Sequence, residues 1–230
     1  MFSLAKKTLG FALIMSAVAS LNANATIIDF TGGTAYLYGG GTGVTNTSTT
    51  YQGVDYYEEG GFRLDFIAND QTPFTSEVGN YYGAGNDVIH GHWATGRFGS
   101  LTEIRVSKID GSSFDLNYFI MTSNTDTGGG PASGNEQAYI HASNDGVNVS
   151  YSQLLPSDDW GFVGLNPQVI LGSAFDSIKY FSFTVDNAVD CFGMDNFYID
   201  EPAPVPEPAP FALLGLAFVA LGLRRRLARK

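Results

Sequence analysis

The chain has 230 residues, including 28 Gly, 17 Phe and 12 Tyr, and only 15% of its residues are charged. Seven of the 12 basic residues lie at the two ends, so residues 26–208 carry five basic against all 23 acidic residues, a net charge of −18. A surface this acidic repels nucleic acid and anionic lipid head groups, which argues against either as a partner of the middle of the chain.

The first 25 residues have the three parts of a secretory signal peptide. Lys6 and Lys7 form a basic start, residues 9–21 are mostly apolar, and Ala23 and Ala25 place small residues where signal peptidase recognises them. Residues 1–25 are therefore expected to form a signal helix that signal peptidase removes. An uncleaved membrane anchor would need a longer apolar core.

Residues 26–200 are expected to form one all-β domain, because short apolar or alternating runs recur between Gly, Asn, Asp and Pro. Apolar residues at 114, 116, 118 and 120, for example, fall on one face of a strand. The number and spacing of such runs predict an antiparallel β-sandwich with a jelly-roll-like arrangement. The expected strands are 26–30, 35–38, 53–58, 62–67, 88–93, 103–108, 114–122, 137–142, 147–153, 168–171, 178–185 and 194–200.

Three glycine-rich stretches, 39–43, 79–85 and 128–134, are expected to be loops. None of them leads from a strand into a helix, so they do not indicate a phosphate-binding loop.

Four aromatic residues are candidates for sugar binding, because a flat exposed ring can stack on the apolar face of a pyranose. Tyr81 and Tyr82 lie in a glycine-rich stretch, Trp93 follows an expected strand, and Trp160 follows two aspartates. Packing in the core or at its rim is the alternative for each of them. Residues 111–116, 138–142 with 145–146, and 194–197 resemble segments of galactose-binding-like and carbohydrate-binding sandwiches, a likeness of fold that does not by itself assign a function.

His90 and His92 lie two residues apart, so a strand would place both imidazoles on one face, with Asp87 three residues upstream. Such residues could bind a transition metal, which a secreted metal-dependent hydrolase would use. Three ligands from one short segment match no recognised signature, however, and a surface or rim position is the alternative. No nucleophile elbow of the Gly-x-Ser-x-Gly type is present, and the domain is expected not to be an enzyme.

Asp and Asn cluster in several expected loops, and their hard oxygen ligands suit Ca²⁺. The same residues are common in turns, and none of the clusters has the EF-hand spacing, so calcium is an option without assigned ligands. The clusters are at 86–87, 124–126, 144–145, 157–159 and 195–196.

Cys191 is the only cysteine, so an intramolecular disulfide is impossible. It lies in a mostly apolar run and is expected to be a small buried hydrophobic residue. A crosslink through Cys191, or an exposed sheet edge, would instead indicate an adhesive protein that contacts other proteins.

The C-terminal residues form a Pro-rich linker, 201–208, followed by fifteen apolar or small residues, 209–223, and then by Arg224, Arg225 and Arg226. As a helix, fifteen residues span about 22 Å, which is less than the ~30 Å hydrocarbon core of a bilayer. Residues 209–230 are therefore expected to form a short hydrophobic helix with a basic end that stays in the cytoplasm.

This order of parts, with Pro206, Glu207 and Pro208 before the short helix and the arginines, resembles the PEP-CTERM sorting tail over residues 205–230. The resemblance implies that an exosortase-type transpeptidase recognises the tail and cuts near the Pro-Glu-Pro triplet. It also implies a Gram-negative host, transient anchoring in the inner membrane, and release to the cell surface or the extracellular matrix. A permanent tail anchor is the alternative. The resulting hypothesis is an exported, non-catalytic surface protein that binds exopolysaccharide.

Overall fold

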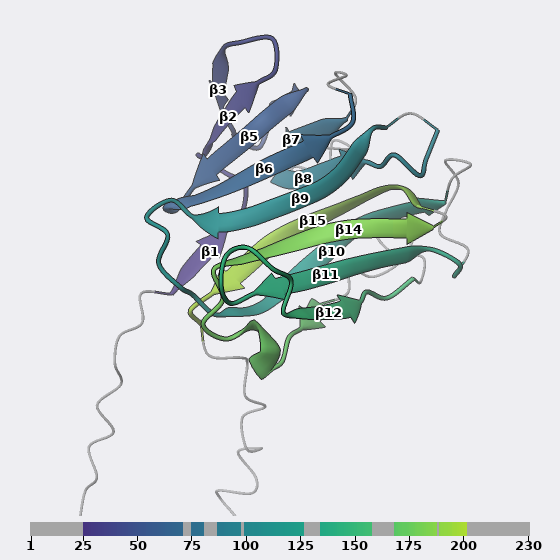
Figure 1. Ribbon diagram of the computed structural model, residues 1–230. Coiled ribbons are helices and arrows are strands. Elements are labelled where there is room, and N and C mark those ends of the chain that lie inside the picture. The colour runs from purple at the N-terminus through teal and green to yellow at the C-terminus, as the bar shows by residue number, and fades with distance from the viewer. Residues whose placement is uncertain are drawn as a thin grey trace, which may run out of the picture.

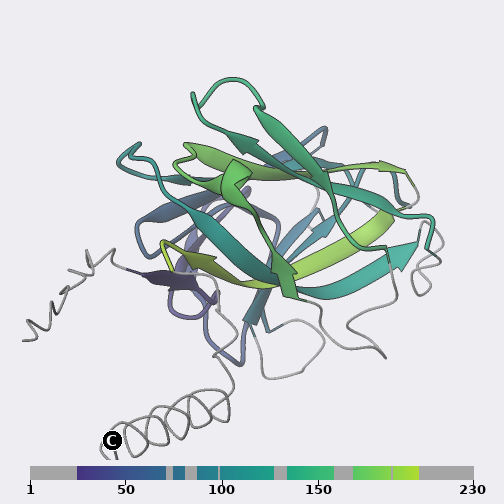
Figure 2. The same ribbon diagram turned by 90° about the horizontal axis from the view of Figure 1, so that it is seen from below.

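The computed structural model describes residues 25–70, 75–80, 87–97, 99–126, 134–157, 168–187 and 189–201. These residues form two antiparallel sheets packed face to face (Figures 1 and 2). The only helical element among them is one 3₁₀ turn, Ser173–Phe175. The expected all-β sandwich is therefore confirmed.

Within the described ranges, the two sheets hold fifteen strands. The seven-stranded sheet has the order β13 (Gln168–Ile170), β10 (Leu116–Asp126), β15 (Val189–Ile199), β8 (Asp87–His92), β7 (Ser76–Asn80) and β4 (Thr50–Gln52), with β1 (Thr26–Ile28) paired to β15. The eight-stranded sheet has the order β12 (Tyr151–Leu154), β11 (Gln137–Ser143), β14 (Tyr180–Asn187), β9 (Leu101–Lys108), β6 (Phe62–Ala68), β5 (Val54–Glu59), β2 (Thr34–Leu37) and β3 (Thr42–Val44).

The core lies between the sheets and is rich in phenylalanine. In β6 the apolar residues Phe62, Leu64 and Phe66 are buried, whereas Arg63 and Asp65 between them are partly exposed. This alternation follows from the two-residue period of a strand. Strand β11 repeats it with Ala138, Ile140 and Ala142, and Phe rings from both sheets meet edge to face in the interior.

Both ends of the domain lie at the same end of the sandwich. β1 runs antiparallel to the end of β15, with Thr26 opposite Ile199 and Ile28 opposite Phe197. The first strand thus begins at the first residue after the predicted signal-peptide cleavage site. Figure 1 shows β1 at the lower left, beside the end of the yellow-green strand β15.

Two of the expected loops are wrong in part. Residues 42–43 of the stretch 39–43 belong to β3, and residues 79–80 of the stretch 79–85 belong to β7. In addition, β4 had no expected strand. These strands contain few apolar residues, so the apolar pattern that identified the other strands is absent from them.

The expected flanking helices lie outside the described residues, apart from Ala25 at the end of the signal segment. Within the described part of the chain, no helix is long and apolar enough to cross a membrane.

Candidate functional site

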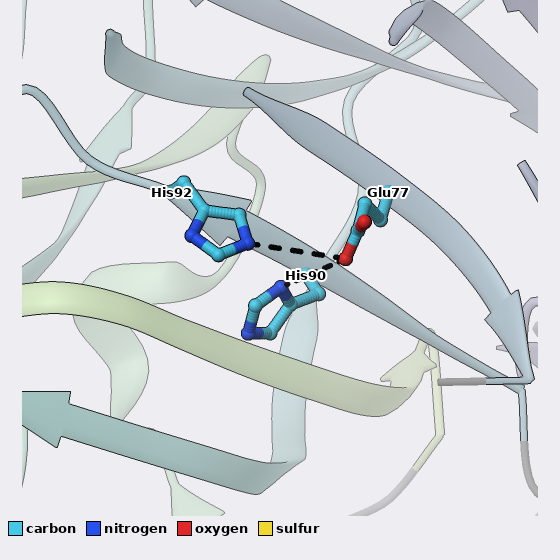
Figure 3. Close-up of side chains that lie close together, drawn as sticks. All are labelled: Glu77, His90 and His92. Atoms are coloured by element: carbon cyan, nitrogen blue, oxygen red, sulfur yellow. Dashed lines mark ion pairs between the residues drawn. The ribbon is translucent and has the colours of Figure 1, made fainter. Parts of the chain in front are cut away.

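Strands β7 and β8 bring together one carboxylate and two imidazoles. Glu77 in β7 is the direct cross-strand partner of His90 in β8, and His92 follows two residues further along β8. Ile89 directly precedes His90 in β8 and faces the core, where it has no exposed surface. The three polar side chains therefore share the face of the seven-stranded sheet that is turned away from the core, and Figure 3 shows them converging.

The three side chains are nevertheless largely shielded from solvent. Glu77 and His90 are 1% and 0% exposed, and the side chain of His92 is 14% exposed. The Glu77 Oε2 atom lies 3.4 Å from His90 Nδ1 and 4.0 Å from His92 Nε2. The two imidazole rings are 4.9 Å apart, and their planes meet at 80°.

One ligand atom from each side chain lies within 4.8 Å of the other two. A carboxylate oxygen and imidazole nitrogens are ligands that Zn²⁺ and related first-row metal ions accept. The other carboxylate oxygen of Glu77, Oε1, accepts a hydrogen bond of 2.5 Å from Gln52 Nε2 of β4. This bond fixes the orientation of the carboxylate, as an outer-shell partner does in metal sites.

The surroundings favour the protonation states that bind a metal. Burial lowers the pKa values of His90 and His92, because a low dielectric disfavours imidazolium, and Glu77 opposes this effect. Burial alone would raise the pKa of Glu77, but His90 and the hydrogen bond from Gln52 lower it overall. Neutral imidazoles and an ionised carboxylate are the ligand forms of these groups.

Asp87, the third metal candidate from the sequence, begins β8 opposite Asn80, and its side chain lies outside the described part of the structure. Among the described side chains, Glu77 is the carboxylate that joins the histidines. Sequence reasoning missed Glu77 because only strand pairing, not local spacing, brings it close.

Trp93 is fully buried, and its ring stacks on that of Phe192 with centroids 4.9 Å apart and planes at 10°. Its ring therefore offers no face to a sugar. Tyr81, Tyr82 and Trp160 lie outside the described residues.

A second surface combines planar and charged side chains. It is the outer face of the eight-stranded sheet, where Tyr36 of β2 and Tyr56 of β5 are cross-strand partners whose rings stack at 4.1 Å and 15°. The guanidinium of Arg63 lies 3.8 Å from the centroid of the Tyr56 ring and is held by Asp65 at 2.7 Å. We call these four residues, all partly exposed, the tyrosine–arginine patch.

The same face continues with polar groups across the sheet. Arg105 of β9, opposite Asp65, forms two hydrogen bonds with Glu103, at 2.9 and 3.1 Å. His141 of β11 is hydrogen-bonded through both ring nitrogens, to Ser152 and Thr184, each at 2.8 Å. The face thus offers hydrogen-bond donors and acceptors beside the rings.

The structure describes the side chains of two whole acidic clusters, one in a turn at 144–145 and one inside β15 at 195–196. Asp145 accepts hydrogen bonds from the backbone N–H groups of Val147 and Asn148, and these bonds hold its pKa well below the usual range. Asp195 accepts bonds from both nitrogens of Asn196. The bonding of Asp145 is the ordinary role of Asp in a turn, whereas Asp195 lies within β15. Calcium binding stays a prediction.

Cys191 is buried, as expected, at 4% exposure. Its position in β15 is directly opposite His92. Of the processing residues, Ala25 is exposed and immediately precedes β1, whereas Ala23, the Pro-Glu-Pro triplet and the three arginines lie outside the described residues.

Several solved structures resemble the sandwich at low identity. A DUF4465 family protein from Bacteroides caccae has 15% identity and a TM-score of 0.38, over 70% of this chain and 90% of that chain. The K1 cleaved adhesin domain of Lys-gingipain from Porphyromonas gingivalis has 16% identity and a TM-score of 0.36, over 66% and 95%. The CBM22-1 xylan-binding domain of Paenibacillus barcinonensis Xyn10C has 12% identity and a TM-score of 0.30, over 66% and 91%. No curated protein matches the chain.

The C-terminal residues 204–226 match the PEP-CTERM protein-sorting motif. The match includes the Pro-Glu-Pro triplet, the apolar segment and the three arginines that carried the resemblance. This motif implies export, sorting by an exosortase and a destination at the cell surface. The described part of the chain therefore forms an all-β sandwich, and residues 204–226 after it carry a PEP-CTERM sorting motif.

Proposed function

We propose that the protein is an exported surface or matrix component whose sandwich binds exopolysaccharide without catalysis. In this proposal signal peptidase releases the N-terminus at Thr26, and an exosortase-type enzyme cuts near Pro206, Glu207 and Pro208. The matched sorting motif at residues 204–226 is the observation that carries the sorting step.

The position of the two ends fits a domain that is anchored to the membrane at one end. Because Thr26 pairs with Ile199, both ends of the sandwich leave from one end of the molecule. While the tail is still anchored, the opposite end of the sandwich and its faces can point away from the bilayer. A ligand outside the cell can then reach either face.

The tyrosine–arginine patch is the observation that favours a glycan as the ligand. Stacked rings supply apolar planar area, and the Arg and Asp groups beside them can exchange hydrogen bonds with sugar hydroxyls. The net charge of −18 over residues 26–208 opposes binding of an anionic polymer. We therefore propose a neutral polysaccharide, with Tyr81, Tyr82 and Trp160 as further contact candidates.

The non-catalytic part of the proposal is supported by burial at the Glu77–His90–His92 cluster. Glu77 and His90 have almost no exposed surface, so a polymeric substrate has little access to them. A catalytic metal site, in contrast, keeps a position open to water and substrate.

Affinity electrophoresis of the full-length chain in gels that contain neutral polysaccharides tests the proposal. Tyr36→Ala and Tyr56→Ala are expected to weaken retardation, since removing one ring of a stacked contact costs about 0.5–1.5 kcal/mol, roughly 2- to 12-fold in affinity. Trp160→Ala tests whether Trp160, a sugar-binding candidate from the sequence, contributes to binding.

A matched control exists on the other sheet. Tyr198 stacks on Tyr118 at 3.9 Å and 18°, the same arrangement as Tyr36 on Tyr56. Tyr198→Ala should therefore leave the retardation unchanged. Equal weakening in all these variants would point to general destabilisation, and no retardation of the parent chain by any polysaccharide would rule the glycan proposal out.

A further inference from the structure

We propose that Glu77, His90 and His92 bind one Zn²⁺-class ion that links β7 to β8. The ligands are a carboxylate oxygen of Glu77 and one nitrogen of each imidazole. The role of the ion is structural, and the inference does not depend on the proposed glycan binding. It rests on the distances, the burial and the hydrogen bonding of the cluster.

The spacing of the three groups fits an ion between them better than a hydrogen-bonded cluster. The distances from Glu77 Oε2 to His90 Nδ1 and His92 Nε2 are 3.4 and 4.0 Å, longer than a good N–H···O hydrogen bond. Ligand atoms around a tetrahedral Zn²⁺ with bonds of about 2.0 Å are about 3.3 Å apart. All three ligand atoms lie within 4.8 Å of one another, so the side chains would have to move closer together to close around an ion.

The hydrogen bonding of Glu77 also indicates a missing partner. Its Oε1 atom accepts the bond from Gln52, but its buried Oε2 atom accepts no hydrogen bond from the part of the chain that the structure describes. Buried carboxylate oxygens are seldom left in this state, because desolvation is costly. A cation bound at Oε2 would compensate for that cost.

The placement on two paired strands suits a structural role. Glu77 comes from β7, both histidines come from β8, and Gln52 of β4 supports the carboxylate. An ion at this point would connect β7 to β8. Because Gln52 of the edge strand β4 donates a hydrogen bond to Glu77, the ion would also stabilise the pairing of β4 with β7. Removing the ion is therefore expected to loosen the β4–β7–β8 side of the sheet.

The test uses the full-length chain, purified in detergent, stripped with a chelator and titrated with Zn²⁺ or Co²⁺. We expect one ion per chain by elemental analysis, a rise in melting temperature on adding Zn²⁺, and visible absorption of bound Co²⁺ typical of four-coordination. A parent chain that binds no stoichiometric ion would overturn the proposal.

Two variants and a matched control localise the site. Glu77→Gln and His92→Gln should each lower the affinity at least as much as the roughly 10–100-fold that loss of an outer-shell partner costs. His141→Gln removes the only histidine outside the cluster and should bind the ion like the parent chain. Melting temperatures in chelator show whether each variant is folded before metal is added.

The remaining outcomes are equally decisive. Retention of the ion in both Glu77→Gln and His92→Gln would place the metal elsewhere, and loss in His141→Gln to the same extent would do so too. Cys191 stands opposite His92, so Cys191→Ser checks the ligand set. Loss of the ion in that variant would contradict the three-ligand assignment.

Discussion

Among single residues, Glu59 has a raised pKa that makes the stability of the folded state depend on pH. Its carboxylate accepts hydrogen bonds from Tyr57 Oη at 2.7 Å and from the backbone N–H of Asp29 at 3.2 Å. Burial raises its pKa from 4.5 to about 7, although these hydrogen bonds act in the opposite direction. The folded state therefore holds a proton that the unfolded state releases between about pH 4.5 and pH 7, and stability falls as the pH rises through this window.

Glu59→Gln should remove this loss of stability. The full pKa difference corresponds to about 3 kcal/mol, and partial exposure of the group reduces this to about 1–2 kcal/mol. The variant is therefore expected to be more stable than the parent chain by that amount at about pH 8 and nearly equal to it at about pH 4.5. Urea denaturation at the two pH values measures the difference.

Glu58→Gln is the control, because the neighbouring residue faces the other side of β5 and accepts a bond from Tyr36. It should keep the pH dependence of the parent chain. If Glu59→Gln kept that dependence as well, another group would be responsible for it.

The two histidines and Trp93 show what can be predicted for the candidate site from the sequence. Strand periodicity correctly puts His90 and His92 on one face, and the same rule puts Trp93 on the opposite face, where it packs on Phe192. Trp93 thus takes the core position that was the alternative to sugar binding. Glu77 could not be found in this way, because its proximity depends on the pairing of β7 with β8.

At the scale of elements, strands with strict alternation were predictable, and strands with few apolar residues were not. The expected segments 62–67, 103–108 and 137–142 lie within β6, β9 and β11, each of which buries apolar residues on one side. By contrast, β3 and β4 have no fully buried residue, and β7 has only one large apolar residue, Val78. Backbone pairing forms these strands, and a single sequence does not reveal such pairing.

The first strand, β1, provides a test of the docking of the N-terminus. Ile28 is fully buried in the core, whereas its neighbour Ile27 is 45% exposed. Ile28→Ala should therefore cost about 2–5 kcal/mol of unfolding free energy, from lost apolar burial and a cavity. Ile27→Ala should cost about 0.5 kcal/mol or less, as is usual for surface substitutions.

Chemical denaturation of the two variants measures this difference. Similar small effects of both would mean that β1 does not pack on β15 in solution. Signal-peptide cleavage would then leave a loose N-terminus rather than a strand of the sandwich.

At the scale of the whole molecule, the acidic and basic residues are unevenly distributed along the chain. Residues 26–208 carry a net charge of −18, and five basic residues lie at positions 224–230. The positive-inside rule predicts that such a basic end stays in the cytoplasm while the domain is exported. This asymmetry was readable from the sequence, and it sets the direction in which the tail can be processed.

Cleavage of the tail is the last prediction. Intact-mass measurement of protein from the surface and medium of the native host should give a species that begins at Thr26 and ends near Pro206–Pro208. Replacing Pro206, Glu207 and Pro208 with alanine should block the second cut, because the triplet lies in the matched motif, and the membrane-bound species should then keep Arg224–Lys230. Pro202→Ala lies outside the match and should be processed normally. A parent chain that kept its basic end in the membrane would be tail-anchored, since a helix of about 22 Å can be held there by flanking arginines that reach the head groups.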